Sequence, residues 1–422
     1  MRLSFQVEVQ PTPTQRQALL QHAGNARWAY NWGLAQYKAA YTKWVELEKP
    51  KKWNGWPNAI GLHRDLNVLK GVPQEEGGVP WMYEASKAAP QETLRNLDVA
   101  FKNFFTGRGR YPRFKSRSRG IGGFRLTGVI RADQKTIKLP TIGRLRVKPG
   151  ERGYLPFGKH AQVSVTERAG RWFVSVVGPE ITEAAPNGLP VVGIDLGVAH
   201  LATLSDGTVF ANPRALAAGQ KKIRRVQKEV SRRQKGSANR GKSRKRLAWV
   251  HARVRNVRQD VLHKATTTIA KSHGKVIIEN LKVRNMTRSA RGTVAAPGRK
   301  VRQKAGLNRV LLDASFAEFR RMLEYKGKRF GCEVVAVNPA YTSQRCSACG
   351  HVESGNRASQ AGFRCLSCSF EINADLNAAI NIMVAGSCPE TENACGEDVR
   401  PGQLRLTRRT SMKQESAGAR GP

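Results

Sequence analysis

Two Cys-x-x-Cys pairs near the C-terminal end constrain the fold of this chain more than any other feature. Cys346 and Cys349 form the first pair, and Cys365 and Cys368 form the second after 15 intervening residues. Two cysteines at this spacing hold one face of a tetrahedral Zn²⁺, and a loop of this length lets a second pair close the other face. Four sulfur ligands leave no open coordination position. The pattern therefore predicts a structural zinc ribbon and not a catalytic zinc.

The start of the chain favours metal binding by these cysteines over disulfide formation. The sequence MRLSFQVEVQ alternates polar and apolar residues, as a half-buried strand does, and lacks the charged and apolar blocks of a signal peptide. We therefore expect a reducing, cytoplasmic compartment. No stretch approaches the roughly 18 apolar residues that a membrane-spanning helix needs, so no membrane partner is expected.

Three acidic residues stand at positions where a carboxylate needs compensation. Asp195 ends the apolar stretch VVGID, Glu279 ends KVIIE, and Asp375 begins an amphipathic run after the second cysteine pair. A single buried acid is most simply explained by a salt bridge to an arginine. Three acids in the order strand, strand and helix instead suit a two-metal phosphodiesterase site. Ligand sets made only of oxygen favour Mg²⁺ or Mn²⁺ over zinc.

The charge of the chain predicts a polyanionic partner. It has 73 Lys and Arg against 31 Asp and Glu, a formal net charge of +42. Nucleic acid is the expected partner, because the alternative, a membrane surface, lacks a lipidation signal or a basic helix with a bulky apolar face.

Residues 214–264 carry the densest positive charge, with 18 Lys and Arg against two acids. A solvated helical surface is the alternative, but basic residues this crowded repel one another unless a polyanion lies alongside. The predicted nucleic-acid contacts in this segment are Arg232, Arg233, Lys235, Arg244 and Lys245.

The stretch GRGRYPRFKSRSRGIGG, residues 107–123, combines glycine, basic residues and aromatic rings. A flexible linker is one interpretation. Nucleic-acid contact is the other, because Arg113, Lys115 and Arg117 can bind phosphates while Tyr111 and Phe114 offer stacking surfaces.

Apolar periodicity predicts how the first half of the chain is organised. Residues 2–9 form a strand, and after the breaker PTPT a helical stretch follows over residues 15–44 with Thr14 as its N-cap. Residues 124–180 show short strands separated by turns, which predicts a small β module that the N-terminal strand can complete.

The second half alternates strands and helices. VVGIDLGVAHLATLSDGTVF predicts two buried strands with Asp206-Gly207 as a hairpin signal. Further elements are expected at 215–271 (two long helices), 275–280 (strand) and 333–337 (strand). Residues 387–422 lack periodicity and are expected to be disordered, and Cys388 and Cys395 within them have no evident role.

Several enzyme classes lack their signature motifs here. The chain has no G-x-x-x-x-G-K-[ST], which argues against a P-loop helicase. Its eight histidines form no H-E-x-x-H pattern, which argues against a zincin. The chain also lacks the full H-x-E…P-C-x-x-C signature, which argues against a zinc deaminase.

Several motifs in a fixed order carry a family resemblance. GIDLG, IIENL, NPAYTSQRCSACG and NADLNAA follow one another, and NARWAYNWGLA, LRNLDVAFKNFF with YPRFKSR, and CGEDVRP extend the match over nearly the whole chain. In these motifs the sequence resembles the TnpB nucleases of bacterial insertion sequences, which are small relatives of type V CRISPR effectors. Such chains are also described as transposases or as accessory proteins of IS200/IS605-type transposition.

The resemblance implies a fold of class α/β plus β-barrel. It implies an RNase H-like (RuvC) nuclease domain with a zinc-ribbon insertion, and a β-barrel wedge domain with an inserted helical recognition domain. The expected boundaries are 1–11 and 119–181 for the barrel, 12–118 for the helical domain with a helix-turn-helix-like N-terminus, 188–342 and 372–386 for the nuclease domain, 343–371 for the zinc ribbon, and 387–422 for the disordered tail.

The resemblance also implies an RNA-guided DNA endonuclease. A guide RNA would pair with target DNA beside a short adjacent motif, and the RuvC site would cut the DNA with Mg²⁺. Carried over by motif, the catalytic residues are Asp195, Glu279 and Asp375. The expected partners are a guide RNA and target DNA, in bacterial cytoplasm and associated with the nucleoid, while the sequence leaves the oligomeric state open.

The chain departs from the family pattern at two positions. Ser369 and Ile372 stand where many members have glycine and histidine, so the turn geometry there is in question. The alternative function is a nucleic-acid-binding transposition regulator without cleavage, and the presence of all three acids argues against it.

Overall fold

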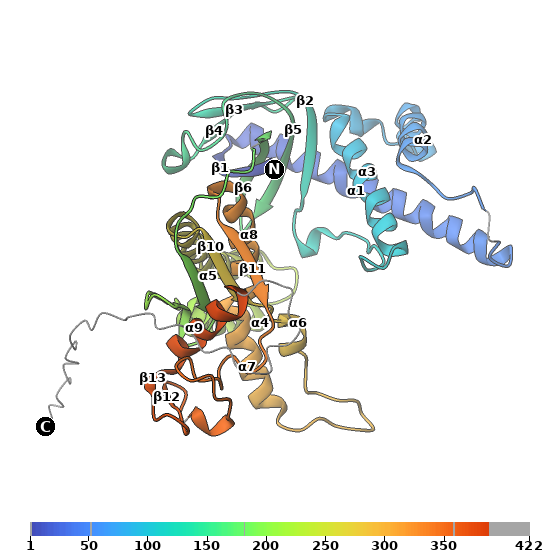
Figure 1. The fold of residues 1–422 in the computed structure, drawn as a ribbon. Coiled ribbons are helices and arrows are strands. Elements are labelled where there is room, and N and C mark those ends of the chain that lie inside the picture. The colour runs from blue at the N-terminus through green and yellow to red at the C-terminus, as the bar shows by residue number, and fades with distance from the viewer. Residues whose placement is uncertain (1, 51–52, 181, 358, 388–422) are drawn as a thin grey trace, which may run out of the picture. The chain divides into compact units, whose positions relative to one another are not determined.

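The computed structural model describes residues 2–50, 53–180, 182–357 and 359–387 and divides into two compact units (Figure 1). The first unit combines residues up to Ala184 with Pro213–His263, and the second combines Ala185–Asn212 with the described residues from Lys264 onward. Cys388, Cys395 and the rest of the predicted tail beyond Ser387 lie outside the described residues. The segment 213–263 falls in the first unit, so the boundary of the nuclease domain at 188–342 stays a prediction.

The strands and α-helices of the described residues have the following bounds. The strands are β1 (Arg2–Gln10), β2 (Gly123–Ala132), β3 (Thr136–Leu139), β4 (Gly143–Val147), β5 (Gly158–Arg168), β6 (Arg171–Glu180), β7 (Val191–Asp195), β8 (His200–Leu204), β9 (Val209–Ala211), β10 (Lys275–Glu279), β11 (Glu333–Val337), β12 (Gly362–Arg364) and β13 (Glu371–Asn373). The α-helices are α1 (Pro13–Glu46), α2 (Ala59–Gly71), α3 (Ala88–Phe105), α4 (Ala215–Arg232), α5 (Ala238–Ser272), α6 (Val283–Met286), α7 (Val301–Ala314), α8 (Phe316–Phe330) and α9 (Ala374–Ser387).

The first unit contains a closed barrel in the order β1-β4-β3-β2-β5-β6. The N-terminal strand closes it as expected, because β1 pairs with β6 along most of its length and with β4 at its end. Alternate residues of the strands point inward, so Val7, Val9, Leu126 and Val174 are buried in one apolar core. Closure leaves this sheet without an exposed edge.

Helix α1 is longer and starts earlier than the sequence suggests. Its N-cap is Thr12, not the predicted Thr14: the Thr12 hydroxyl accepts a hydrogen bond from the Gln15 N–H while the Gln15 side chain accepts one from the Thr12 N–H. The helix then continues unbroken to Glu46. Residues 13–46 therefore form one helix, and the helix-turn-helix-like N-terminus of the helical domain stays a prediction.

The second unit is built on a mixed five-stranded sheet in the order β11-β10-β7-β8-β9. The strands β11, β10 and β7 are parallel, and β8 and β9 extend the sheet in antiparallel fashion. Gly207 takes the positive φ that the predicted Asp206-Gly207 turn requires, at +87°. This arrangement has the RNase H-like character that was expected.

Helix α9 lies directly against the sheet at a glycine. A Cβ atom on Gly193 of β7 would collide with the Ala379 carbonyl oxygen and the Met383 backbone nitrogen of α9. Gly386 of α9 similarly meets Ile277 of β10. Glycine at position 193 lets the backbone of β7 approach the backbone of α9, and glycine at position 386 lets the backbone of α9 approach the Ile277 side chain. This close packing places the first turn of α9 beside the ends of the central strands.

Among the described residues, no helix combines the length and apolar character needed to cross a membrane.

We expect Gly193→Ala to destabilise the second unit by about 1 to 3 kcal/mol, because the added methyl group collides with backbone atoms that cannot move independently. Gly306→Ala is the matched control: Gly306 lies in α7 with nothing near its missing Cβ, so alanine there should stabilise the helix by about 0.5 to 1 kcal/mol. Urea unfolding followed by circular dichroism measures both. Equal stability of Gly193→Ala and wild type would contradict the close-packing interpretation.

Candidate metal and carboxylate sites

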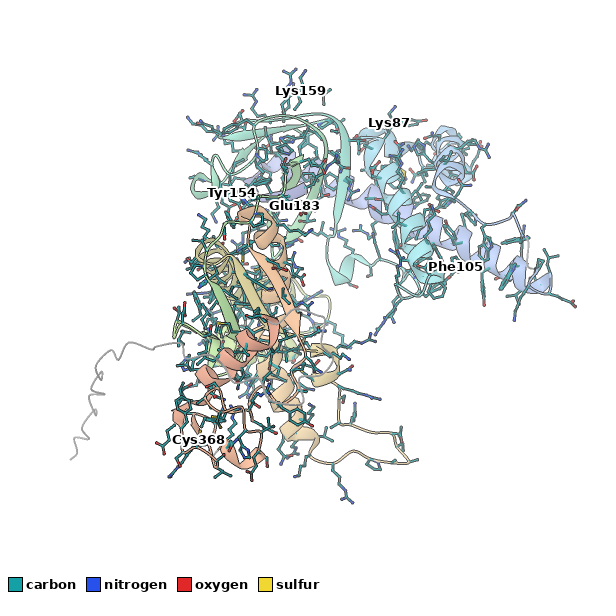
Figure 2. The ribbon with its side chains drawn as sticks, viewed as in Figure 1. Lys87, Phe105, Tyr154, Lys159, Glu183 and Cys368 are labelled. Atoms are coloured by element: carbon teal, nitrogen blue, oxygen red, sulfur yellow. The ribbon has the colours of Figure 1, made fainter. Side chains whose placement is uncertain are left out.

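The four predicted zinc ligands meet in one cluster. The sulfur atoms of Cys346, Cys349, Cys365 and Cys368 all lie within 4.8 Å of one another. The Cys346 and Cys368 sulfurs are 3.8 Å apart, and those of Cys349 and Cys365 are 3.6 Å apart. A tetrahedron with Zn–S bonds of about 2.3 Å has S···S edges of about 3.8 Å. The cluster therefore has the size of a structural zinc site (Figure 2, where Cys368 is labelled).

The two zinc knuckles have the same backbone turn. Gly350 follows the second cysteine of one pair with φ at +80°, and Ser369 follows the second cysteine of the other with φ at +61°. This explains why glycine suits the position at which the chain has Ser369. Burial acts to raise the pKa of Cys365. Hydrogen bonds from the backbone N–H groups of Cys368 and Ser367, together with side-chain hydrogen bonds from Cys368 and Cys349, outweigh it and lower the pKa to about 6. A thiolate is the form that binds zinc.

The sheet brings two of the three predicted carboxylates together. The strands β7 and β10 are parallel and pair Ile194 with Ile278. Continuing this register by one residue sets Asp195 beside Glu279 at the carboxyl edge of the sheet. Neighbouring strands lie about 4.8 Å apart and paired residues share a face, so these two side chains are neighbours.

The third carboxylate comes from α9. Asn373 caps this helix, with its side-chain oxygen accepting hydrogen bonds from the N–H groups of Asp375 (2.9 Å) and Leu376 (3.2 Å). Because α9 packs on β7 at Gly193, Asp375 in its first turn reaches the same edge. The negative charge of Asp375 contributes to the raised pKa of Asp195, after burial and the charge of Glu279.

The crowding of these acids changes their protonation. Burial, and then the charges of Glu279 and Asp375, raise the pKa of Asp195 to about 7, although Arg357 and a hydrogen bond from the Leu196 N–H act in the opposite direction. Burial also raises the pKa of Glu279, opposed by a hydrogen bond from Thr342. Half-buried carboxylates that resist ionisation together are the usual sign of a site that binds a cation.

Two further residues at this site carry no signal in the sequence. Arg357, in the loop between the cysteine pairs, lies with its Nη2 atom 3.8 Å from Asp375 Oδ1 and also acts on Asp195. The Thr342 hydroxyl lies 2.6 Å from Glu279 Oε1. The charge argument required a compensating cation near the acids, but only the fold shows that it is Arg357.

The carboxylate cluster suits a divalent ion by its donors. Its oxygen atoms are the ligands that Mg²⁺ and Mn²⁺ prefer. In the part of the chain that the structure describes, the four cysteines form the one group of three or more His, Cys, Asp or Glu ligand atoms that all lie within 4.8 Å of one another. The oxygen atoms of the three carboxylates therefore lie further apart than the cysteine sulfurs.

The predicted basic helices form a hairpin of α4 and α5. Ile223 of α4 packs with Val250 and Val254 of α5 in a small apolar cluster. Glu229 fastens the hairpin, because its carboxylate lies 2.8 Å from Arg233 Nη2 and accepts a hydrogen bond from Ser243 (2.9 Å).

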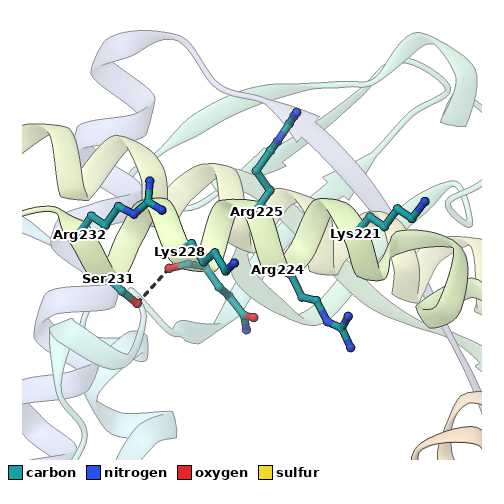
Figure 3. A pocket seen from close by; sticks show the side chains of 7 residues that line it. Lys221, Arg224, Arg225, Lys228, Ser231 and Arg232 are labelled. Carbon is teal, nitrogen blue, oxygen red and sulfur yellow. Dashed lines mark hydrogen bonds between the residues drawn. The ribbon is translucent and has the colours of Figure 1, made fainter.

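A basic hollow of about 790 Å³ lies along α4 (Figure 3). Figure 3 shows Arg224 and Arg225 extending from different sides of the helix. The residues lining the hollow are Lys221, Arg224, Arg225, Gln227, Lys228, Ser231 and Arg232. Of the predicted contacts, Arg232, Lys235, Arg244 and Lys245 are exposed, whereas Arg233 is half-buried against Glu229.

The glycine-rich loop at 107–123 is held in place and does not behave as a free linker. The Asn31 side chain donates a hydrogen bond to the Lys115 carbonyl (2.9 Å) and accepts one from its N–H (2.8 Å). The Lys115 ammonium lies 3.8 Å from the centre of the Tyr30 ring, and burial lowers its pKa. Arg244 of α5 donates to the Ser118 carbonyl (2.6 Å). The exposed side chains of Arg113 and Arg117 remain available to a ligand.

Comparison with known proteins agrees with this architecture. A family described as "Probable transposase" (IS605 OrfB) matches residues 162–290, and a family described as "Cas12f1-like, TNB domain" matches residues 316–382. A protein of Escherichia coli (strain K12), "Putative RNA-guided DNA endonuclease InsQ", is 37% identical over 421 residues, which are 98% of this chain and 99% of that protein. The chain belongs to the TnpB family.

Other members and one solved structure extend the TnpB comparison. A "Putative RNA-guided DNA endonuclease" of Streptomyces pristinaespiralis is 32% identical over 98% of this chain and 96% of that protein. The fold is similar to that in "Cryo-EM structure of the Cas12f1-sgRNA-target DNA complex", with a TM-score of 0.54 and 16% identity over 88% of this chain and 82% of that one. A family named "Helix-turn-helix domain" matches residues 1–44, where the described residues form β1 and the unbroken α1.

We expect Ser369→Gly to slow zinc release and Gly350→Ser to hasten it, each by about fivefold, because a left-handed backbone costs a non-glycine residue about 1 kcal/mol. Transfer of zinc to a coloured chelator measures both rates. Because the two variants should change the rate of zinc release in opposite directions, each is a control for the other. An unchanged rate in Gly350→Ser would contradict the shared turn geometry.

In Mg²⁺-free buffer, Asp195→Asn should be more stable than wild type by on the order of 2 kcal/mol at pH 8. The pKa of Asp195 is raised to about 7, so the folded protein holds a proton that the unfolded chain loses near pH 4. Wild-type stability therefore falls from pH 4 to pH 7, and the two curves should meet near pH 4. Thermal unfolding measures them. Asp206→Asn is the control. Burial acts to raise the pKa of Asp206, but hydrogen bonds from Thr208 and His273 outweigh it and lower the pKa, so removing this charge should not stabilise the fold.

Proposed function

We propose that this chain is an RNA-guided DNA endonuclease that hydrolyses phosphodiester bonds of target DNA. The observation that carries the proposal is the convergence of Asp195, Glu279 and Asp375 at the carboxyl edge of an RNase H-like sheet. The names of the InsQ and Streptomyces relatives support the choice of RNA guide and DNA substrate. A nucleoid-associated location in bacteria would follow from that substrate.

In this mechanism the three carboxylates would hold two Mg²⁺ or Mn²⁺ ions. When bound, such ions supply an activated water nucleophile and stabilise the charge that develops on the scissile phosphate. The raised pKa of Asp195 means that its proton must leave before the site reaches full charge, which favours activity at and above neutral pH. The Arg357 guanidinium, beside Asp375, is placed to balance negative charge in the cluster and at an incoming phosphate.

The basic surfaces would bind the nucleic-acid backbones. We propose that Arg232, Lys235, Arg244 and Lys245 on the α4–α5 hairpin contact phosphates of guide or target, as do Arg113 and Arg117. Arg233 and Lys115 would contribute mainly by shaping these surfaces, through Glu229 and Tyr30 respectively. The predicted domain boundaries belong to the same proposal.

Cleavage of target DNA tests the proposal. Protein co-purified with its RNA should cut matching DNA in Mg²⁺, and Asp195→Ala should lose at least about 100-fold of the rate, because the remaining acids cannot hold both ions. Asp206→Ala, an acid of the same unit outside the cluster, is the control and should keep wild-type activity. If wild type and Asp195→Ala leave the DNA equally intact, the protein is a nucleic-acid-binding regulator without cleavage.

A further inference from the structure

The short segment from Thr342 to Ser347 touches the carboxylate cluster at one end and the zinc site at the other. At its start, the Thr342 hydroxyl lies 2.6 Å from Glu279 Oε1 and 3.1 Å from the Pro339 carbonyl oxygen. A hydroxyl has a single proton to donate, and an ionised carboxylate is the stronger acceptor. The Thr342 hydroxyl therefore donates its proton to Glu279, and not to the Pro339 carbonyl, while Glu279 is ionised.

The same segment is fastened to α9 by two asparagines on one helical face. Asn377 accepts a hydrogen bond from the Ser347 N–H (3.0 Å) and donates one to the Arg345 carbonyl (2.8 Å). Asn381 donates to the carbonyls of Arg345 (2.7 Å) and Thr342 (3.0 Å). Both amides are buried, at 0% and 7% exposure, so each of these hydrogen bonds would be costly to break.

The other end of the segment belongs to the zinc ribbon. Cys346 lies between the two residues that Asn377 binds, and it is itself buried in the thiolate cluster. Tyr341, which precedes the segment, is exposed yet adopts a φ of +63°. A left-handed backbone at a tyrosine persists only when its surroundings enforce it. It turns the chain so that Thr342 can face Glu279.

We propose that Thr342, Asn377 and Asn381 are positioning residues that hold Glu279 and Asp375 at a fixed separation, and that the zinc ribbon sets this separation through the shared segment. Glu279 is held through the Thr342 hydroxyl, and Asp375 is held because it lies on the same helix as the asparagines. The zinc site thereby acts on the carboxylates without touching them. The inference rests on the proposed function, since it assumes that the carboxylates bind divalent ions.

The test uses two variants of Thr342 in the full chain with its RNA. Thr342→Val keeps the shape of the side chain and removes the donor, whereas Thr342→Ser keeps the hydroxyl. Electron paramagnetic resonance of Mn²⁺ measures binding, and subtracting the signal of Asp195→Ala removes ions held by RNA. We expect Thr342→Val to weaken the Asp195-dependent binding about 10- to 100-fold and Thr342→Ser to restore it to near the wild-type value.

A second pair of variants tests the asparagines. Asn381→Leu should weaken Mn²⁺ binding and slow cleavage while one zinc ion per chain is retained. Asn308→Leu is its matched control, because Asn308 also donates to a backbone carbonyl, that of Thr287 (2.9 Å), but lies on α7 outside the segment. The control should bind Mn²⁺ as wild type does. Zinc content and melting temperature are measured for every variant, so a general loss of folding is recognised.

The outcomes separate the two claims. If wild type shows Asp195-dependent Mn²⁺ binding and Thr342→Val and Asn381→Leu bind equally well, the positioning role is wrong and the proposed function stands. If wild type shows no Asp195-dependent binding, the carboxylate metal site itself is wrong, and the positioning role with it. If Thr342→Ser binds as weakly as Thr342→Val, the hydroxyl is not the positioning group.

Discussion

The contact between α9 and β7 at Gly193 is the constraint on which the candidate active site depends. Two carboxylates come from neighbouring parallel strands, and their distance follows from sheet geometry alone. The third, Asp375, lies on α9, and a helix can pack on a sheet at many different positions. A backbone-to-backbone approach, possible only without a Cβ at Gly193, removes this freedom and brings Asp375 to the strand ends. The zinc ribbon then enters the chain just before this helix.

Charge balance is the second organising constraint. Burial, and then the charges of Glu279 and Asp375, raise the pKa of Asp195 to about 7, so a cation bound at the cluster would relieve this repulsion. In a chain with a net charge of +42, the obvious compensation would be a set of arginine salt bridges. Among the ion pairs of the described residues, one involves these three acids: Arg357 lies 3.8 Å from Asp375. The acids are therefore left largely available for metal ions, while the basic residues gather on other surfaces.

Much of the site could be predicted because its chemistry is written into residue type and spacing. Cysteine pairs at this spacing predict a zinc site without any knowledge of the fold. Acids at the ends of apolar strands predict a cation-binding site, because burial of an unpaired carboxylate is costly. Other roles depend on contacts between distant residues. Thr342 and Arg357 are ordinary polar residues in the sequence, and nothing in the sequence indicates that the Lys115 ammonium lies over the Tyr30 ring. Thr14 suits an N-cap by residue type and position, but the capping box that Thr12 forms with Gln15 appears only in the structure.

The sequence by itself predicted the cysteine cluster, the three acids, the central strands and long helices, and a polyanionic partner, because each depends on local pattern or on total charge. Tertiary structure alone decided that the acids meet, that α1 is a single helix, and that two asparagines and a threonine join the zinc ribbon to the carboxylates. These features arise from the close approach of segments that lie far apart in the chain. No local pattern encodes such an approach, since it depends on which surfaces pack together when the sheet and α9 form.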